Sequence, residues 1–148
     1  MTDPMTDLRK RIIELINQAE YAAFATITET DKPWVRFVSP RASEDMTLRF
    51  STFANSRKVR QLAKHAEVHL TLSVGDAGTM TYLQIQGLAR VTDDLAELTA
   101  YWRPEMAEYF KGPDDPQYRI VIIEPYLVEV NLPGQVEPLV WGIPGVKV

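Results

Sequence analysis

The residues best suited to chemistry in this sequence are Ser56, Arg57 and Lys58, which follow a strand-like alternation of apolar residues at 48–52. An apolar stripe at helical spacing comes next, and we expect Asn55 to cap that helix. The serine and the two cations then fall in the first helical turn, where free backbone N–H groups and the helix dipole already favour negative charge. Two cations at this point disfavour the helix but favour a bound dianion, so the pattern predicts a phosphate site.

A solvated basic turn that binds nothing is the alternative explanation of this pattern. Such a turn would tolerate its unfavourable place at the helix dipole at a cost of roughly a few tenths of a kcal/mol. The surrounding charge favours a ligand, because the 148-residue chain has a formal net charge of -4 and yet carries a local group of cations. An acidic protein does not attract nucleic acid broadly, so we expect a small anionic ligand and no nucleic acid. The local cations are Arg36, Arg41, Arg49, Arg57, Lys58 and Arg60.

The composition is that of an ordinary globular protein, with 45% hydrophobic and 24% charged residues, and we expect a single domain over residues 1–148. The absence of cysteine excludes disulfides, thiolate metal sites and a cysteine nucleophile. The polar N-terminal stretch MTDPMTDLRK does not resemble a signal peptide, and no apolar run approaches the length that spans a membrane. We therefore expect a cytoplasmic protein without a membrane partner.

The elements that must position the cationic turn are predicted from periodicity. Residues 1–20 form an amphipathic helix that covers a sheet, because apolar residues recur on one of its faces. Two antiparallel hairpins are expected, one over residues 21–39 and one over residues 67–91, each with a polar or glycine-rich turn. Arg36 interrupts a half-apolar face in the first hairpin, and an exposed edge cation is the alternative to a binding role for it.

Two short helices and two further strands are predicted in the C-terminal half. Asp93 or Asp94 caps the first helix, and Pro104 opens the second. Strands at 118–123 and 126–130 follow, and we expect the Glu-Pro pair between them to separate them.

The strands add up to about six in antiparallel hairpins, for which a closed or half-closed barrel is the natural arrangement. Gly87, inside a predicted strand, indicates a bulge or a close approach of another backbone or a ligand. Residues 133–148 are rich in proline, glycine and valine without periodicity, so we expect an irregular C-terminal tail that packs on the body or on a partner chain.

Catalytic groups of the common kinds are missing from the sequence. His65 and His69 fall near a helix end and in a strand, so they do not form a helical metal pair, and we expect no metal site. His69 as a ligand of haem iron is a minor alternative. Neither a nucleophile elbow nor a glycine-rich nucleotide loop occurs. A phosphate site beside aromatic residues, without an evident acid or base, indicates that a cofactor brings the chemistry.

Four segments together resemble one known family. They read RFVSPR at 36–41, FSTFANSRK at 50–58, YLQIQG at 82–87 and WRPEMAEYFKGPDDP at 102–116. The family is that of the FMN-binding split-barrel proteins related to pyridoxamine 5'-phosphate oxidase, and the likeness is to its general stress protein branch. The resemblance implies a mainly β, α+β fold, namely a six-stranded antiparallel split β-barrel with peripheral helices. It also implies a homodimer that binds FMN between its subunits.

The same resemblance implies the cofactor-binding residues. Arg36 and Lys58 would hold the FMN phosphate with help from Ser56 and Arg57, and Arg41 would lie near the pyrimidine end of the flavin. The remaining implied residues run along the isoalloxazine or line the same pocket. These are Phe37, Val38, Ser39, Ser51, Thr52 and, where the oxidase has a glutamine, Tyr82.

Aromatic residues complete the implied pocket. Because the family builds it between two subunits, the partner chain would supply Tyr82 or rings such as Trp102 and Trp141. Tyr109 and Phe110 are interpreted either as helix-packing aromatics or as a lid over the flavin.

The C-terminal stretch EPLVWGIPGVKV lacks the arginine and histidine with which the oxidase grips its substrate, so we do not expect pyridoxamine phosphate oxidation. The first hypothesis is an FMN-dependent oxidoreductase, with FAD as the alternative flavin and a nicotinamide or other small molecule as reductant. The second hypothesis is a stress-response protein that binds a flavin without turnover. A deazaflavin or haem on the same barrel is the third.

Overall fold

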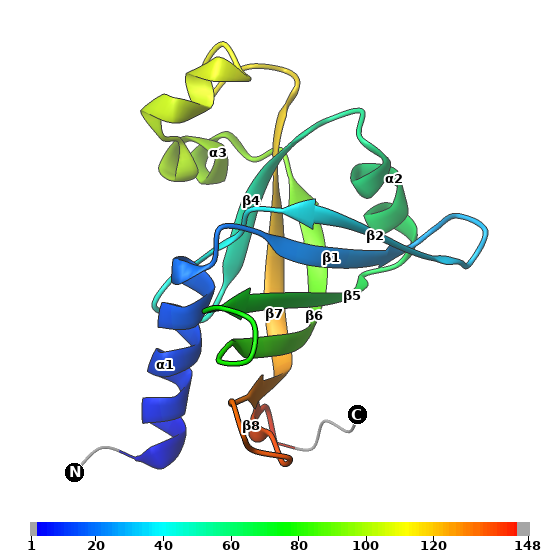
Figure 1. Cartoon of the computed structure of the whole chain (residues 1–148). Helices are drawn as coiled ribbons and strands as arrows, with labels where there is room; N and C mark the ends of the chain where they lie inside the picture. The colour runs from blue at the N-terminus through cyan, green and yellow to red at the C-terminus, as the bar shows by residue number, and fades with distance from the viewer. Residues whose placement is uncertain (1–2, 145–148) are drawn as a thin grey trace.

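The computed structural model describes residues 3–144 (Figure 1). Helix α1, Pro4–Gln18, stands at one side of a curved sheet and buries Ile12, Leu15 and Ile16. Asp3 occupies the N-cap position but its side chain makes no capping hydrogen bond. The expected N-terminal covering helix is confirmed, because the apolar face predicted from the sequence is the buried face.

All strand pairs are antiparallel, and the sheet has the order β2-β1-β5-β6-β7-β4-β3, with β8 added beside β7. The ends of this order, β2 and β3, do not pair with each other in the described chain, so the sheet is curved but not closed. The strands are β1 Ala22–Ile27, β2 Pro33–Val38, β3 Arg41–Ala42, β4 Leu48–Phe53, β5 Glu67–Val74, β6 Thr81–Thr92, β7 Tyr118–Asn131 and β8 Leu139–Gly142.

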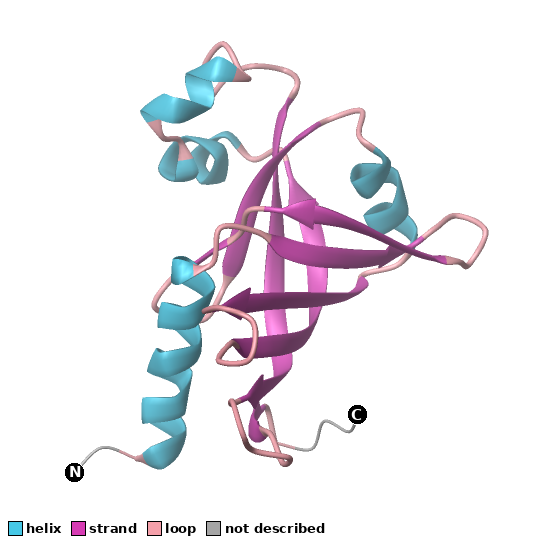
Figure 2. Cartoon of the chain, viewed as in Figure 1, coloured by secondary structure: helices cyan, strands magenta, loops and turns pink. Residues whose placement is uncertain are grey.

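The remaining helices lie at the periphery of the sheet (Figure 2). They are α2 Arg57–Lys64, α3 Leu95–Tyr101 and a 3-10 helix, η1, at Pro104–Glu108. Asp94 caps α3, since its carboxylate accepts a hydrogen bond from the backbone N–H of Glu97 at 3.1 Å. Mainly antiparallel strands with peripheral helices confirm the predicted α+β split-barrel fold. The predicted count of six strands is wrong, because the short strands β3 and β8 bring the sheet to eight. No helix within residues 3–144 is both long and apolar enough to cross a membrane.

The predicted separation of the last two strands is wrong, because β7 runs without interruption through Pro125. The neighbouring strand β6 changes register between Gln86 and Gly87, and Gly87 then pairs with Pro125. This bulge accommodates the proline, which has no N–H to donate to the sheet. The bulge expected at Gly87 is therefore confirmed, and it explains why the proline does not end the strand.

The expectation of an irregular tail is wrong for residues 139–142, which form β8 and pair with residues 127–130 of β7. Trp141 in this strand packs, partly buried, against the main core. The tail therefore packs on the body of its own chain, and residues 145–148 lie outside the described part of the chain.

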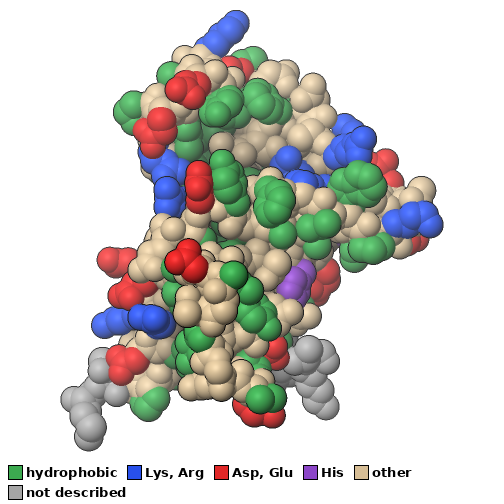
Figure 3. Space-filling view, viewed as in Figure 1, with side chains coloured by type: hydrophobic (Ala, Val, Ile, Leu, Met, Phe, Trp, Pro, Cys, Tyr) green, Lys and Arg blue, Asp and Glu red, His purple; other side chains and the backbone are tan. Residues whose placement is uncertain are grey.

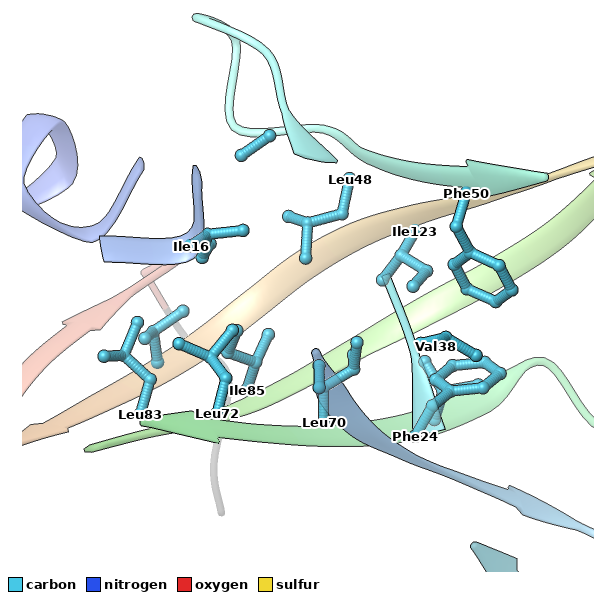
Figure 4. Packing of buried hydrophobic residues seen from close by; sticks show 14 of the residues in the cluster. Ile16, Phe24, Val38, Leu48, Phe50, Leu70, Leu72, Leu83, Ile85 and Ile123 are labelled. Atoms are coloured by element: carbon cyan, nitrogen blue, oxygen red, sulfur yellow. The ribbon is translucent and has the colours of Figure 1, made fainter. Parts of the chain in front are cut away.

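Two apolar cores share β7, whose buried residues point alternately to either side. Val121 and Ile123 belong to the main core inside the curved sheet, where Phe24 and Phe50 meet edge to face at 5.2 Å (Figure 4). Tyr118, Ile120 and Ile122 belong to a smaller core under α3 and η1. The other buried residues of this smaller core are Leu98, Met106 and Phe110. The smaller core fixes α3 and η1 beside the end of β4, where the cationic turn begins.

Candidate functional site

The cationic turn between β4 and α2 forms as predicted, but its cap is one residue later. Ser56 has extended backbone angles and is the N-cap, so the prediction of Asn55 is wrong. The N–H of Ser56 donates to the carbonyl of Phe53 at 3.0 Å, which holds Asn55 within a tight turn and delays the helix. The hydroxyl groups of Ser56 and Thr52 lie 3.0 Å apart, and Arg57 and Lys58 occupy the first turn of α2 as expected.

Arg36, Arg57 and Lys58 form a cationic cluster that lacks acidic partners. Within residues 3–144, none of the three has a carboxylate oxygen within the 4.0 Å of an ion pair. Burial lowers the pKa of Arg36, and the charge of Arg57 lowers it further. Burial likewise lowers the pKa of Lys58, with a smaller contribution from Arg36. Arg36 and Lys58 are thus held in the folded protein against desolvation and repulsion, which is the electrostatic setting of an anion site.

Arg36 is not an exposed edge cation, because its guanidinium is half-buried and anchored. Its Nη1 donates to the Thr26 hydroxyl at 2.7 Å, and its Nη2 donates to Oε1 of Gln61 at 2.8 Å. The guanidinium carbon lies 5.8 Å from the centre of the Phe24 ring. Arg57 is exposed and lies over the ring of Trp34 at 5.2 Å. The β1–β2 hairpin and α2 together therefore build the cluster (Figure 1).

A cavity of about 300 Å³ opens beside Lys58. The structure brings six of the predicted cofactor-binding residues to its wall, namely Phe37, Val38, Ser39, Ser51, Thr52 and Lys58. Ser56 adjoins the wall through its contact with Thr52, whereas Arg36 and Arg57 stand beside Lys58 without lining the cavity. Phe37 is 77% exposed and so presents an apolar ring at the mouth.

Four further aromatic residues line this cavity and were not predicted as site residues: Phe50, Phe53, Tyr109 and Phe110. The rings of Phe53 and Phe110 lie 4.8 Å apart, so the segment just after η1 meets the end of β4 at the cavity. Phe110 is buried in the smaller core while Tyr109 is 66% exposed, so the first ring packs and the second remains open to solvent. Phe50 and Phe53 could have been predicted as lining residues from the sequence, because they flank the predicted site residues Ser51 and Thr52 in β4.

Tyr82 does not reach this cavity within one chain. It lines a second cavity of about 330 Å³ together with Tyr21, Met80 and Phe37, and Phe37 is the ring that both cavities share. The two tryptophans expected at the flavin are partly buried against their own chain. Trp102 packs edge to face on Tyr118 at 5.5 Å, and Trp141 packs on the main core.

Arg41 lies in another cationic group, outside the cavity wall. It is exposed, donates to the carbonyl of Asn17 at 2.8 Å, and faces Arg49 across β3 and β4. Arg103 lies over the ring of Tyr101 at 4.8 Å and donates to its hydroxyl at 2.9 Å. Burial raises the pKa of Tyr101, while the neighbouring arginines oppose that shift. The structure therefore separates Arg41 from the cluster of Arg36, Arg57 and Lys58.

The histidines are apart from each other and from the cavity. Nε2 of His65 lies 3.0 Å from Oδ1 of Asp31, at the tip of the β1–β2 hairpin. His69 is half-buried in β5, where burial lowers its pKa and Glu129 opposes the shift. Across residues 3–144 no three His, Asp or Glu side chains gather in a way that could hold a metal ion.

The unclosed antiparallel sheet, with a cationic strand-to-helix turn beside an aromatic cavity, defines a protein of the split-barrel class. The chain belongs to the pyridoxamine 5'-phosphate oxidase family, whose sequence profile matches residues 8–131. That match includes the β1–β2 hairpin, the cationic turn and the whole of β7, so the elements that build the site lie within the family's domain.

Several relatives of similar length are named as general stress proteins or as related to them. General stress protein 26 of Bacillus subtilis (strain 168) is 22% identical over 138 residues, which are 90% of this chain and 94% of that protein. The crystal structure of general stress protein 26 from Bacillus anthracis str. Sterne matches with a TM-score of 0.76 and 22% identity, over 92% of this chain and 98% of that one. A Clostridium acetobutylicum protein related to general stress protein 26 matches with a TM-score of 0.77 and 18% identity, over 93% and 96%.

Two structures of the same fold have names that mention other ligands. A heme binding protein from Mycobacterium smegmatis has a TM-score of 0.71 and 16% identity, over 96% of this chain and 60% of that one. A protein named F420 reductase has a TM-score of 0.61 and 20% identity, over 78% and 93%. At these identities the likeness concerns the fold alone.

Proposed function

We propose that this protein binds FMN, with the phosphate at the cluster of Arg36, Arg57 and Lys58. The observation that carries the proposal is that these three cations adjoin an aromatic cavity and have no carboxylate partner within residues 3–144. A phosphate dianion would supply the missing negative charge, and the first N–H groups of α2 and the Ser56 hydroxyl would add hydrogen bonds.

The lining of the cavity fits a flat heteroaromatic ring. Phe37, Phe53 and Tyr109 offer apolar faces, and Ser39 and Ser51 offer hydroxyl groups for the polar edge of such a ring. A cavity with aromatic walls, a few polar groups and a cation at one side is typical of a site for a phosphorylated cofactor. The residues present therefore fit FMN, with FAD as the alternative flavin.

Oxidoreductase capacity is the second part of the proposal. A bound flavin supplies hydride and electron transfer, while the protein supplies binding, orientation and local charge. No carboxylate or histidine lines the cavity within residues 3–144, so neither kind of side chain is offered as an acid or base to the reacting atoms. Lys58 would instead stabilise negative charge in the cavity. A nicotinamide or another small molecule would be the reductant.

A homodimer completes the proposed site. Tyr21, Phe37, Met80 and Tyr82 are all large, exposed and grouped around the second cavity, with exposed fractions of 58%, 77%, 43% and 38%. Hydrophobic side chains form a broad patch over the β1–β2 region in Figure 3. Exposed patches of this kind mark interaction surfaces. A second copy covering this face would close the mouth at Phe37 and bring its own Tyr82 toward the flavin.

Titration with FMN, followed by quenching of flavin fluorescence, tests the binding proposal. The parent should bind tightly, and Arg36→Ala and Lys58→Ala should each weaken binding by about tenfold or more, since each removes a charge-assisted contact to phosphate. Arg11→Ala removes an exposed cation from α1 and is the matched control, which should bind as the parent does. A folded parent that binds no FMN would overturn the proposal.

Two further measurements separate the remaining alternatives. Anaerobic mixing with NADH or NADPH distinguishes an oxidoreductase, which shows a saturable rate of flavin reduction, from a protein that binds a flavin without turnover. The absorption spectrum of the isolated protein distinguishes a flavin from a haem or a deazaflavin, which are the alternative ligands that the names of the two fold relatives suggest.

A further inference from the structure

A buried polar pair stands directly behind the cationic cluster. Thr26 in β1 is 2% exposed and Gln61 in α2 is 4% exposed, and the Thr26 hydroxyl donates to Oε1 of Gln61 at 2.5 Å. Buried polar side chains are costly unless they are bonded, and these two bond to each other and to Arg36. Their location between the hairpin and α2 calls for an explanation beyond core packing.

The hydrogen bonds of this pair fix the orientation of every group in it. Arg36 carries only donors, so the Thr26 hydroxyl must accept from Nη1 and can donate only onward, to Gln61. Oε1 of Gln61 accepts hydrogen bonds from both Thr26 and Arg36. If the side-chain amide were turned over, its NH2 group would face these two donors and could accept from neither, so the oxygen must lie at this position. The guanidinium is thereby held by two neutral side-chain acceptors, one from each side of the cluster. Nη1 also makes longer contacts with the carbonyl oxygens of Phe24 at 3.3 Å and Trp34 at 3.4 Å, which are neutral as well.

Neutral acceptors have a consequence for charge. They hold the guanidinium in place without cancelling its positive charge, whereas a carboxylate at position 61 would form an ion pair with it. We propose that Gln61, with Thr26, is a positioning residue that keeps Arg36 both fixed and uncompensated for the phosphate of the ligand. This inference rests on the function proposed above, because it assigns a role at the same phosphate site.

Further contacts hold α2 and the hairpin in one arrangement. Nζ of Lys64 donates to the carbonyl of Glu29 at 2.9 Å, and His65 meets Asp31 at 3.0 Å. Figure 1 shows α2 beside the β1–β2 hairpin, close to its turn. Because Arg36 comes from the hairpin and Lys58 from α2, the pair at Thr26 and Gln61 sits where the two halves of the phosphate site join. A preformed arrangement loses less conformational freedom when the ligand binds.

The test compares three variants of the full chain, Gln61→Leu, Gln61→Glu and Thr26→Val, with Thr92→Val as a control that removes another buried hydroxyl. FMN and riboflavin are both titrated, because riboflavin lacks the phosphate. Gln61→Leu and Thr26→Val should weaken FMN binding about tenfold, and Gln61→Glu at least that much, with riboflavin affinity unchanged. Thermal unfolding checks that each variant is folded. If Gln61→Glu does not fold, Gln61→Leu still tests the inference.

A double-mutant cycle distinguishes positioning from a general loss of structure. In the Arg36→Ala background, Gln61→Leu should change FMN affinity by less than about twofold, because the group it positions is gone. A loss that persists in that background, an equal loss of riboflavin affinity, or parent-like FMN binding by Gln61→Glu would overturn the inference while FMN binding by the parent stands.

An NMR measurement keeps the inference separate from the flavin proposal. In the ligand-free parent the Arg36 side chain should give an ordered Nε–Hε signal, and Gln61→Leu should make that side chain measurably more mobile, because Nη2 loses its acceptor while Nη1 keeps Thr26. A parent that binds neither flavin but shows this change would overturn the proposed function and leave the positioning of Arg36 intact. An Arg36 signal that is mobile in the parent would overturn the inference directly.

Discussion

Gly87 and the carbonyl oxygen of Glu124 approach so closely that a Cβ atom on Gly87 would lie 2.8 Å from that oxygen. The same Cβ would lie 3.1 Å from Cγ2 of Ile123. Both contacts belong to β7 at the bulge opposite Pro125, where the backbone is held by pairing on both sides. A side chain at position 87 would therefore force two paired strands apart.

We predict that Gly87→Ala lowers the free energy of unfolding by about 1–3 kcal/mol, the usual range for overpacking against an unyielding neighbour. Urea unfolding followed by circular dichroism measures it. Gly142→Ala is the control, because the Cβ there would meet the flexible Cδ1 of Leu127 at 3.3 Å. Equal effects of the two substitutions would contradict the assignment of Gly87 as a close-approach position.

Lys58 is expected to lower the stability of the ligand-free protein while it contributes to binding of the phosphate. Burial and the Arg36 charge lower its pKa, so protonated Lys58 is less favourable in the folded chain than in the unfolded one. The penalty is full below the folded pKa and is relieved as the pH rises through that value toward 10.5. Lys58→Met should therefore stabilise the ligand-free protein at pH 7, by about 1 kcal/mol or less because the side chain is only half-buried.

The measurement for Lys58→Met is urea unfolding of parent and variant at several pH values. Their difference should shrink as the pH approaches 10.5, while FMN binding by the variant should be weaker than the parent's by about tenfold or more at pH 7. A variant that is less stable than the parent at pH 7 would show that Lys58 has a favourable contact in the ligand-free protein.

Glu97 should supply acid-sensitive stability. Its carboxylate accepts hydrogen bonds from Arg90 and from the Thr92 hydroxyl, which lower its pKa to about 2 from the ordinary 4.5. A depressed carboxyl pKa stabilises the fold above the unfolded value, and this contribution disappears as the pH falls from 4.5 toward 2. Glu97→Gln should cost about 1 kcal/mol or less at pH 7, because the carboxylate is 37% exposed and solvent screens it.

Acid titration of unfolding stability checks the role of Glu97. The parent should lose more stability than Glu97→Gln between pH 4.5 and 2, so the two curves should converge at low pH. Glu14→Gln changes an exposed carboxylate on α1 and should leave the parent curve unchanged. Parallel curves for parent and Glu97→Gln would rule out the proposed contribution.

Trp141 is expected to stabilise β8 without contacting the flavin. Its ring is partly buried against the main core and lines a cavity with Arg9 and Glu124, away from Lys58. Trp141→Ala should cost about 1–3 kcal/mol, less than the loss of a fully buried tryptophan. FMN affinity, measured by fluorescence titration, should stay within about twofold of the parent's. A large loss of affinity in a folded variant would instead support a contribution of Trp141 to the partner's site.

Local pattern predicted the elements around the site well. The alternation in β4 and the apolar stripe of α2 are short-range features, and the turn between them was placed within one residue, at Ser56 instead of Asn55. The two errors elsewhere involve distant partners. Pro125 continues a strand because Gly87 lies opposite, and residues 139–142 become a strand because β7 offers them an edge.

The sequence by itself determined which residues alternate, which face of each helix is apolar and where a cationic turn occurs, because these depend on neighbours a few positions apart. Tertiary structure alone decided that Arg36 meets Gln61, 25 residues away, and that these cations lack acidic partners within residues 3–144. It also separated Arg41 and Tyr82 from the cavity beside Lys58. Such contacts depend on how the sheet curves and which strands pair, and no local periodicity encodes them.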